Sequence, residues 1–268
     1  MITLSDDLER AVALPRPAER IVSLVPSLTE TLFALGRGDA VVGVTRYCTE
    51  PSDIPARVER VGGTKNPDIA RIGALQPDLV LINAEENRRE DYAALEQLGL
   101  TVFVSFSHRA RDVVDLIRKL GALAGVPAAA ARMATALSDT LADVERQATG
   151  ERLRVFCPIW KNPWMSFNQD TYADDMLWLA GGSNVCRDQA ARYFTVTLDA
   201  VAQAAPEVIL LPDEPYVFAP KDLPSLAPLQ ATPAHRAGRI HYIDGKALSW
   251  YGRRTAAALR YLRGILQG

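Results

Sequence analysis

The sequence has few cysteines, few histidines, no long apolar run and no large excess of charge. Three cysteines in 268 residues are too few and too scattered for a disulfide framework, and their odd number leaves at least one thiol unpaired. No stretch of about 18 uninterrupted apolar residues is present, so no segment is predicted to span a membrane. The net charge of −2, without a basic run, argues against a nucleic-acid-binding protein.

The first ten residues lack the features of a secretory signal and read MITLSDDLER. Such a signal needs a basic start and a run of roughly 7–15 apolar residues. Asp6, Asp7 and Glu9 stand where that run belongs. The location expected from the sequence is therefore the cytoplasm, whose reducing conditions suit three scattered cysteines.

The order of the predicted elements indicates an α/β protein with two Rossmann-like lobes, each built on a parallel sheet. The length suits two lobes of roughly 130 residues. Apolar runs typical of covered parallel strands alternate with helical segments in both halves. The pattern Ser27-Leu28-Thr29-Glu30 predicts a capping box that opens the first helix. We predict strands over residues 21–25, 40–45, 78–83, 101–105, 154–159, 207–211 and 239–243, and helices over residues 27–36, 69–75, 90–98, 111–124, 128–148 and 255–266.

One long helix is predicted to join the two lobes. Residues 128–148 are rich in alanine, contain no Gly or Pro, and would form a rigid rod roughly 31 Å long. The expected organisation is an N-terminal α/β lobe, a linker helix and a C-terminal α/β lobe over residues 1–126, 127–150 and 151–268.

An internal similarity supports two related lobes. Residues 72–82 and 201–211 each contain a helix end, then Pro and an acidic residue, then an apolar strand. The alternative is that this order simply recurs in α/β proteins.

The loops that follow the strands are the candidate binding site. Open α/β sheets bind ligands at the carboxyl ends of their strands, so two facing lobes would hold a ligand in the cleft between them. Three of the four tryptophans fall in these loops. Aromatic clefts with a few polar groups suit large, flat and partly apolar ligands. The alternative is that Trp160 and Trp164 fill the core of their own lobe.

No catalytic or metal-binding arrangement is evident. There is no phosphate-binding loop and no nucleophile elbow, and the three histidines do not have metal-ligand spacing. We therefore predict no enzyme activity, no metal site and no required cofactor. Cys48 and the pair Glu85-Glu86 are the residues on which an alternative enzyme hypothesis would depend.

Several segments, in their order and spacing, carry a family resemblance. They are Arg20 to Ser27 with Thr29-Glu30, Val42-Gly43-Val44 with Tyr47, Ala74 to Leu81, Gly181 to Val185, Ala205 to Ile209, and the helix at 128–148. Together they resemble the helical-backbone periplasmic binding proteins that serve ABC importers of vitamin B12, haem and ferric siderophores. The likeness extends from Arg20 to Leu266 and is greatest for the vitamin B12-binding branch.

The resemblance implies a ligand held between the lobes by loop aromatics and backbone. Thr64 stands where the vitamin B12 branch has a tryptophan, and Tyr193 stands where it has another. Arg46, Lys65, Lys161 and Arg253 are available for carboxylates or phosphate. The predicted ligand-binding residues are Pro26, Arg46, Tyr47, Thr64, Lys65, Trp160, Trp164, Phe167, Tyr193, Trp250, Tyr251 and Arg253.

The resemblance also implies docking to an importer permease through one glutamate on each lobe. The first position is Ala70 here, with Asp68 nearby, and the second is Asp199. Asp68 and Asp199 are therefore the predicted docking residues. Loss of one glutamate and the absence of an export signal together favour a cytosolic protein that is uncoupled from an importer.

The leading hypothesis is a non-enzymatic protein that holds a cobalamin-like corrinoid or a related metal complex in the cleft between the lobes. The expected partner is that small molecule, the resemblance adds the permease of an ABC importer, and no nucleic acid is expected. Three alternatives stay open at this point. They are an exported substrate-binding component of an ABC importer for siderophore or haem, a cytosolic enzyme acting on a metal complex, and a partner-binding protein whose cleft is filled by side chains.

Overall fold

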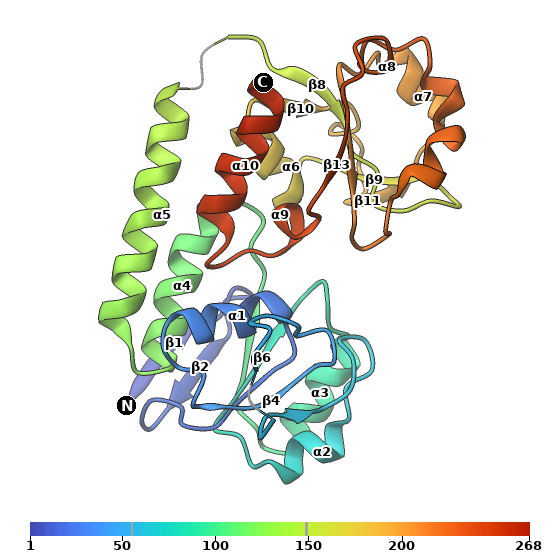
Figure 1. Cartoon of the computed structure of the whole chain (residues 1–268). Helices are drawn as coiled ribbons and strands as arrows, with labels where there is room; N and C mark the ends of the chain where they lie inside the picture. The colour runs from blue at the N-terminus through green and yellow to red at the C-terminus, as the bar shows by residue number, and fades with distance from the viewer. Residues whose placement is uncertain (55, 148–149) are drawn as a thin grey trace. The chain divides into compact units, whose positions relative to one another are not determined.

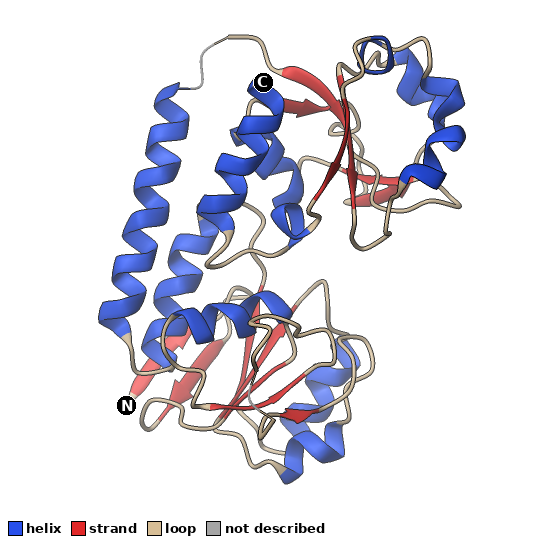
Figure 2. Ribbon diagram, viewed as in Figure 1, coloured by secondary structure: helices blue, strands red, loops and turns tan. Residues whose placement is uncertain are grey.

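The computed structural model describes residues 1–54, 56–147 and 150–268, and the chain forms two compact units (Figure 1). Each unit takes in a short segment from a distant part of the sequence. Unit 1 comprises Met1–Ser107, Arg111–Ser138 and Tyr251–Arg253, and unit 2 comprises the described residues of His108–Ala110, Asp139–Trp250 and Arg254–Gly268. Each unit contains a parallel sheet flanked by helices, which confirms the predicted α/β fold with two parallel-sheet lobes (Figure 2).

Unit 1 contains a five-stranded parallel sheet in the order β5-β4-β3-β6-β7, and an antiparallel hairpin formed by β1 and β2. Strands β3 and β6 pair in parallel, with Ile21 of β3 beside Leu79 of β6. The elements of unit 1 are β1 (Ile2–Ser5), β2 (Ala11–Leu14), β3 (Ile21–Ser23), α1 (Pro26–Ala34), β4 (Val41–Val44), β5 (Glu59–Arg60), α2 (Ile69–Ala74), β6 (Leu79–Asn83), α3 (Arg89–Gln97), β7 (Val102–Ser105), α4 (Asp112–Leu123) and the first part of α5 (Pro127–Gln147).

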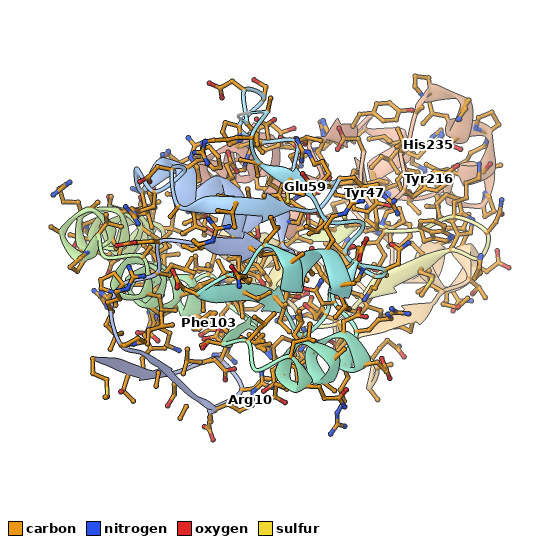
Figure 3. All side chains as sticks on the ribbon, turned by 90° about the horizontal axis from the view of Figure 1, so that it is seen from below. Arg10, Tyr47, Glu59, Phe103, Tyr216 and His235 are labelled. Carbon is orange, nitrogen blue, oxygen red and sulfur yellow. The ribbon has the colours of Figure 1, made fainter. Side chains whose placement is uncertain are left out.

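The central strands of unit 1 are buried on both faces. Val80 and Val104 pack on one face with Ile72 of α2 and Leu95 of α3. Phe103, labelled in Figure 3, alternates with these residues and is also fully buried. Burial on both faces explains why the strands read as continuous apolar runs in the sequence.

Unit 2 has a four-stranded parallel sheet in the order β10-β8-β12-β13, and an antiparallel ribbon formed by β9 and β11. Its core includes Phe156 and Ile209 from the sheet, Val201 from α7 and Leu229 from the 3₁₀ helix η1. The elements of unit 2 are β8 (Leu153–Phe156), β9 (Met165–Phe167), α6 (Tyr172–Leu179), β10 (Gly182–Asn184), β11 (Tyr193–Thr195), α7 (Leu198–Gln203), β12 (Val208–Pro212), η1 (Pro220–Leu229), α8 (Pro233–Arg236), β13 (Ile240–Ile243), α9 (Lys246–Ser249), α10 (Thr255–Gln267) and the second part of α5.

The internal similarity seen in the sequence extends to backbone geometry. Gln76, after α2, and Ala205, after α7, both adopt a left-handed conformation, with φ of 46° and 50°. Each is followed by a proline, Pro77 or Pro206, which cannot continue a helix. The chain therefore leaves α2 and α7 in the same way before it enters a central strand.

A shared set of hydrogen bonds holds these two turns. Asp78 accepts the backbone N–H of Arg20 at 2.9 Å, and Glu207 accepts the backbone N–H of Arg154 at 2.9 Å. The Nε of each arginine donates to the carbonyl of the left-handed residue, at 3.3 Å in unit 1 and 2.9 Å in unit 2. Because the same hydrogen bonds recur in both units, two related lobes are favoured over a chance recurrence of the sequence pattern.

The predicted capping box at the start of α1 is wrong. The helix begins one residue earlier, with Val25 as N-cap and Pro26 at the first helical position, and no side chain caps it. Proline suits this position because its φ is fixed at a helical value and its missing N–H is not needed there. Ser27 lies inside the helix without a hydrogen-bond partner for its hydroxyl, and Glu30 forms an ion pair with Arg253 at 2.7 Å.

Helix α5 is continuous from Pro127 to Gln147 and contributes to both units. The predicted end of this helix at Ala148, and residues 148–149 of the predicted linker, lie outside the described residues. In unit 1, α4 and α5 approach so closely that a Cβ on Gly121 would collide with the Cβ of Ala130. In unit 2, Arg263 of α10 donates to Gln147 at 3.1 Å.

We expect Gly121→Ala to destabilise the protein by about 1–3 kcal/mol, because the added methyl group has to push α5 away from α4. Gly264→Ala in α10 is the matched control, since its new Cβ meets no atom within 4 Å. That control should stabilise the protein by about 0.5–1 kcal/mol through helix propensity. Urea unfolding of both variants measures the difference, and equal effects would contradict the close packing of α4 and α5.

Candidate ligand-binding site

Three loops at the carboxyl-end side of the unit 1 sheet are joined by hydrogen bonds. The backbone N–H of Arg46 donates to the carbonyl of Gly62 at 2.8 Å. The side chain of Asn87 donates to the carbonyl of Thr64 at 2.8 Å. We call this assembly the unit 1 loop cluster, and it consists of residues 45–48, 62–66 and 84–87.

The loop after β4 is fixed from within and presents Tyr47 to solvent. The Arg60 guanidinium donates to the carbonyls of Thr45 at 3.0 Å and Cys48 at 2.8 Å. The Cys48 thiol is fully buried and lies 3.2 Å from the Thr29 hydroxyl. By contrast, Tyr47, which is labelled in Figure 3, is 51% exposed by its accessible surface. The loop thus holds an aromatic ring outward on a rigid turn.

Burial raises the pKa of the Cys48 thiol, although the hydroxyls of Thr29 and Thr45 act in the opposite direction. A buried thiol with a raised pKa is a poor nucleophile. Cys48 is therefore a packing residue, and it gives no support to the enzyme hypothesis that depended on it.

The segment Tyr251–Arg253 belongs to unit 1 and is bound within it. The Tyr251 ring is only 5% exposed. Its hydroxyl is hydrogen-bonded to the side-chain amide of Asn83 and lies 3.0 Å from the Ser105 hydroxyl. Arg253 pairs with Glu30, and its backbone N–H donates to Thr31 at 3.2 Å. These contacts place the Tyr251 hydroxyl among buried polar groups of unit 1.

Asn83 connects Tyr251 to the loop after β6. Its side-chain oxygen accepts the backbone N–H groups of Glu85 at 2.8 Å and Glu86 at 2.9 Å. Burial raises the pKa of Tyr251 well above its usual value, and the nearby charges of Glu86 and Glu85 raise it further. The folded protein therefore keeps this phenol protonated.

Unit 2 presents a group of four packed aromatic rings. Trp160 is 42% exposed and meets Tyr216 edge-on, with ring centroids 5.8 Å apart. Phe218 contacts Tyr216 and stacks on Trp164 at 5.8 Å with an interplanar angle of 8°. We call this group the unit 2 aromatic cluster, and it consists of Trp160, Trp164, Tyr216 and Phe218.

The other predicted aromatic residues of unit 2 differ in exposure. Phe167 is fully buried in β9, and it pairs with Tyr193 of β11, which is 44% exposed. Trp250 is 8% exposed and lies between Lys246 and Arg254, whose charged groups are 4.8 and 5.4 Å from its ring centroid. Tyr193 and Trp160 are thus the predicted unit 2 aromatics whose rings are most open to solvent.

An ion pair lies beside the unit 2 aromatic cluster. Lys161 donates to Asp222 at 2.7 Å, and the Tyr216 hydroxyl donates to the same carboxylate at 3.1 Å. The hydrogen bond from Lys161 is the main cause of a lowered pKa for Asp222. Tyr216 and Asp222 were not among the predicted site residues. The aromatic residues after β12 are a sequence signal that could have identified Tyr216. No local signal identifies Asp222, because its partner Lys161 is 61 positions away in the sequence.

The two predicted docking residues lie at the starts of the equivalent helices α2 and α7. Asp68 is the N-cap of α2, where it accepts the backbone N–H of Arg71 at 2.9 Å. Asp199 is exposed in the first turn of α7, which is capped by Thr197 instead. Asp68 therefore has a structural task that Asp199 does not have.

The described residues, which omit 55 and 148–149, contain no group of three or more His, Cys, Asp or Glu side chains arranged to hold a metal ion. In the same part of the chain, no helix is long and apolar enough to cross a membrane.

These features agree with a known family of binding proteins. A family model described as Periplasmic binding protein matches residues 21–247, so the chain belongs to that family. Its members are non-enzymatic solute-binding proteins. The prediction that the chain is a binding protein and not an enzyme is thereby confirmed.

Named relatives match both the sequence and the structure. A vitamin B12-binding protein of Vibrio cholerae is 31% identical over 199 residues, which cover 74% of this chain and 72% of the relative. The crystal structure of the periplasmic vitamin B12 binding protein BtuF of Vibrio cholerae has a TM-score of 0.83 at 27% identity, covering 94% of this chain and 98% of that chain.

Two further relatives broaden the comparison. The periplasmic haem-binding protein RhuT from Roseiflexus sp. RS-1 has a TM-score of 0.81 at 27% identity, covering 93% of this chain and 98% of that chain. An uncharacterized ABC transporter substrate-binding lipoprotein of Bacillus subtilis, YvrC, is 30% identical over 221 residues, which cover 79% of this chain and 69% of the relative. Family members are thus periplasmic or lipoproteins.

We expect Tyr251 to make protein stability depend on alkaline pH. Because its pKa is raised on folding, its contribution is complete below the unfolded pKa of about 10 and is lost as the pH rises further. Tyr251→Phe should cost about 1 kcal/mol at pH 7 through lost hydrogen bonds, and should flatten the fall in stability above about pH 10. Burial also raises the pKa of Tyr172, so this residue accounts for the dependence of stability on alkaline pH that remains in the Tyr251→Phe variant. Urea unfolding between pH 7 and 11 measures both effects, and an unchanged alkaline slope would contradict the buried phenol.

Proposed function

We propose that the chain is the substrate-binding component of an ABC importer, and that its ligand is a metal-containing macrocycle such as haem or vitamin B12. The observation that carries the proposal is the set of exposed aromatic rings in the two units. Tyr47 of unit 1 and Trp160 of unit 2 lie on loops that follow strands of the parallel sheets, and Tyr193 of unit 2 lies on β11. Aromatic side chains suit a large, flat and partly apolar ligand. The relatives named for vitamin B12, haem and ABC transport support it.

The predicted residues differ in exposure, and we assign them different roles on that basis. We assign direct ligand contact to the exposed rings of Tyr47, Trp160 and Tyr193. We assign a positioning role to Phe167 and Tyr251, because their side chains are buried. The rest of the proposed set consists of Pro26, Arg46, Thr64, Lys65, Trp164, Trp250 and Arg253.

The comparisons favour the importer hypothesis over the cytosolic one. Relatives named as periplasmic proteins and as an ABC transporter substrate-binding lipoprotein match most of the chain. None of these matches supports a cytoplasmic protein that is uncoupled from an importer. The alternative of an exported binding component is therefore the one we propose for this chain.

Trp160→Leu is expected to weaken the binding of haem or cobalamin by about tenfold, because an exposed ring that stacks on the ligand is lost. Titration of tryptophan fluorescence with each ligand measures the affinity. Trp178→Leu is the matched control. Its ring lies between Arg152 and Arg187, with guanidinium carbons 3.7 and 4.0 Å from the centroid, near the amino end of β8.

The wild-type protein and the Trp178→Leu variant should bind a macrocycle with equal affinity. If neither haem nor cobalamin quenches the fluorescence of the wild-type protein at millimolar concentration, the proposed function is wrong. Equal weakening in both variants would instead remove Trp160 from the proposed site.

Asp199→Lys is expected to reduce the recovery of an importer permease with this protein by about tenfold, because exposed charges at an interface guide association and fix register. Asp139→Lys, on an exposed position of α5, is the charge-matched control. Co-purification from membranes of the native cell measures recovery, and haem affinity should not change in either variant. Equal recovery of the permease with both variants would contradict a docking role for Asp199.

A further inference from the structure

Four basic residues of the proposed site were candidates for binding an anionic group, and the structure distinguishes them. Lys161 is paired with Asp222 at 2.7 Å, and Arg253 is paired with Glu30 at 2.7 Å. Over residues 1–54, 56–147 and 150–268, Arg46 makes no ion pair with a carboxylate, and neither does Lys65. Of these four residues, Arg46 and Lys65 are therefore the two whose positive charge is not paired with a carboxylate of the described residues.

The Arg46 guanidinium is held in a defined position. Its Nη2 donates to the side-chain oxygen of Asn66 at 3.2 Å, and its carbon lies 5.2 Å from the centroid of the Tyr47 ring. It also lies against Gly63, where an added Cβ would come within 2.8 Å of Nη2 and would collide with Asn66. Because only one of its five N–H groups is used in these contacts, the guanidinium can still bind a carboxylate through two parallel hydrogen bonds.

Lys65 adds a second charge on a neighbouring loop of the unit 1 loop cluster. Its ammonium donates to the backbone carbonyl of Glu85 at 2.5 Å, which fixes its position without neutralising its charge. Its other two N–H groups are not used by that bond. Arg46 and Lys65 are therefore both anchored to the unit 1 loop cluster by neutral oxygen acceptors.

We infer that Arg46 and Lys65 form a carboxylate-binding subsite, and that the ligand is a macrocycle that carries carboxylates, as haem does with its two propionates. This inference rests on the proposed function. A macrocycle whose acidic groups are converted to amides or esters lacks the charge that this subsite recognises. Tyr47, next to Arg46, would contact the apolar part of the same ligand.

The test compares iron protoporphyrin, its dimethyl ester and cyanocobalamin, each titrated into the protein in a detergent-matched buffer. The ester keeps the ring and the metal but has no carboxylate. We expect the wild-type protein to bind haem about tenfold to a hundredfold more tightly than the ester, as for charge-assisted hydrogen bonds. The preference should shrink as salt is added, because the groups are exposed.

Three variants locate the effect. Arg46→Gln and Lys65→Gln should each weaken haem binding by about tenfold and leave ester binding unchanged. Gly63→Ala keeps both charges but displaces the guanidinium, and it should weaken haem binding in the same selective way. Arg118→Gln, exposed on α4, removes the same charge elsewhere and should change neither affinity.

Each other outcome has a definite meaning. Equal binding of haem and ester by the wild-type protein, or equal weakening of both ligands in Arg46→Gln and Lys65→Gln, would overturn the subsite and leave the proposed function intact. Binding of cyanocobalamin with no binding of haem would do the same. If none of the three macrocycles binds, the proposed function itself fails, and the subsite fails with it. Circular dichroism and urea unfolding confirm that each variant is folded before it is titrated.

Discussion

The hydrogen bonds of the Asn83 side chain organise the carboxyl-end side of unit 1. This buried amide stands at the end of β6, donates to the carbonyl of Ser105 on β7 at 2.9 Å, and is hydrogen-bonded to the Tyr251 hydroxyl. Its oxygen accepts the backbone N–H groups of Glu85 and Glu86 in the next loop. One polar side chain therefore joins two strands, a loop and a distant segment. A buried amide with several partners is costly to disrupt, because each lost hydrogen bond leaves a desolvated polar group.

The two units hold the loops of the proposed site by different means. In unit 1 the loops are held by hydrogen bonds to backbone groups, including those from Arg60 and Asn87. In unit 2 the exposed Trp160 rests on other aromatic rings, and Lys161 is neutralised by Asp222. The two units differ in this respect although both contain a parallel sheet and the same turn before a central strand.

The sequence predicted the elements whose pattern is local. Buried strands such as β6 and β12 are continuous apolar runs, and α5 is a long stretch of helix formers, so each was placed within a few residues. The hairpin β1–β2 and the ribbon β9–β11 were missed. Their strands have three or four residues, and their pairing depends on partners elsewhere in the fold.

The candidate site was predicted only in part, because exposure and pairing are tertiary properties. The sequence located the aromatic loops, but Tyr251 is separated by 168 positions from Asn83, and Arg253 by 223 positions from Glu30. No local pattern could show that Tyr251 is buried or that Arg253 is neutralised. Similarly, the position of Arg46 depends on Gly63 and Asn66, which come from a different loop.

Macrocycle binding can be tested by the visible absorption spectrum of the protein purified from its own cell, recorded again after incubation with haem and gel filtration. We expect the intense Soret band of a haem that remains with the protein. A protein that stays colourless after incubation with haem, and likewise after incubation with cobalamin, would contradict a macrocycle-binding function.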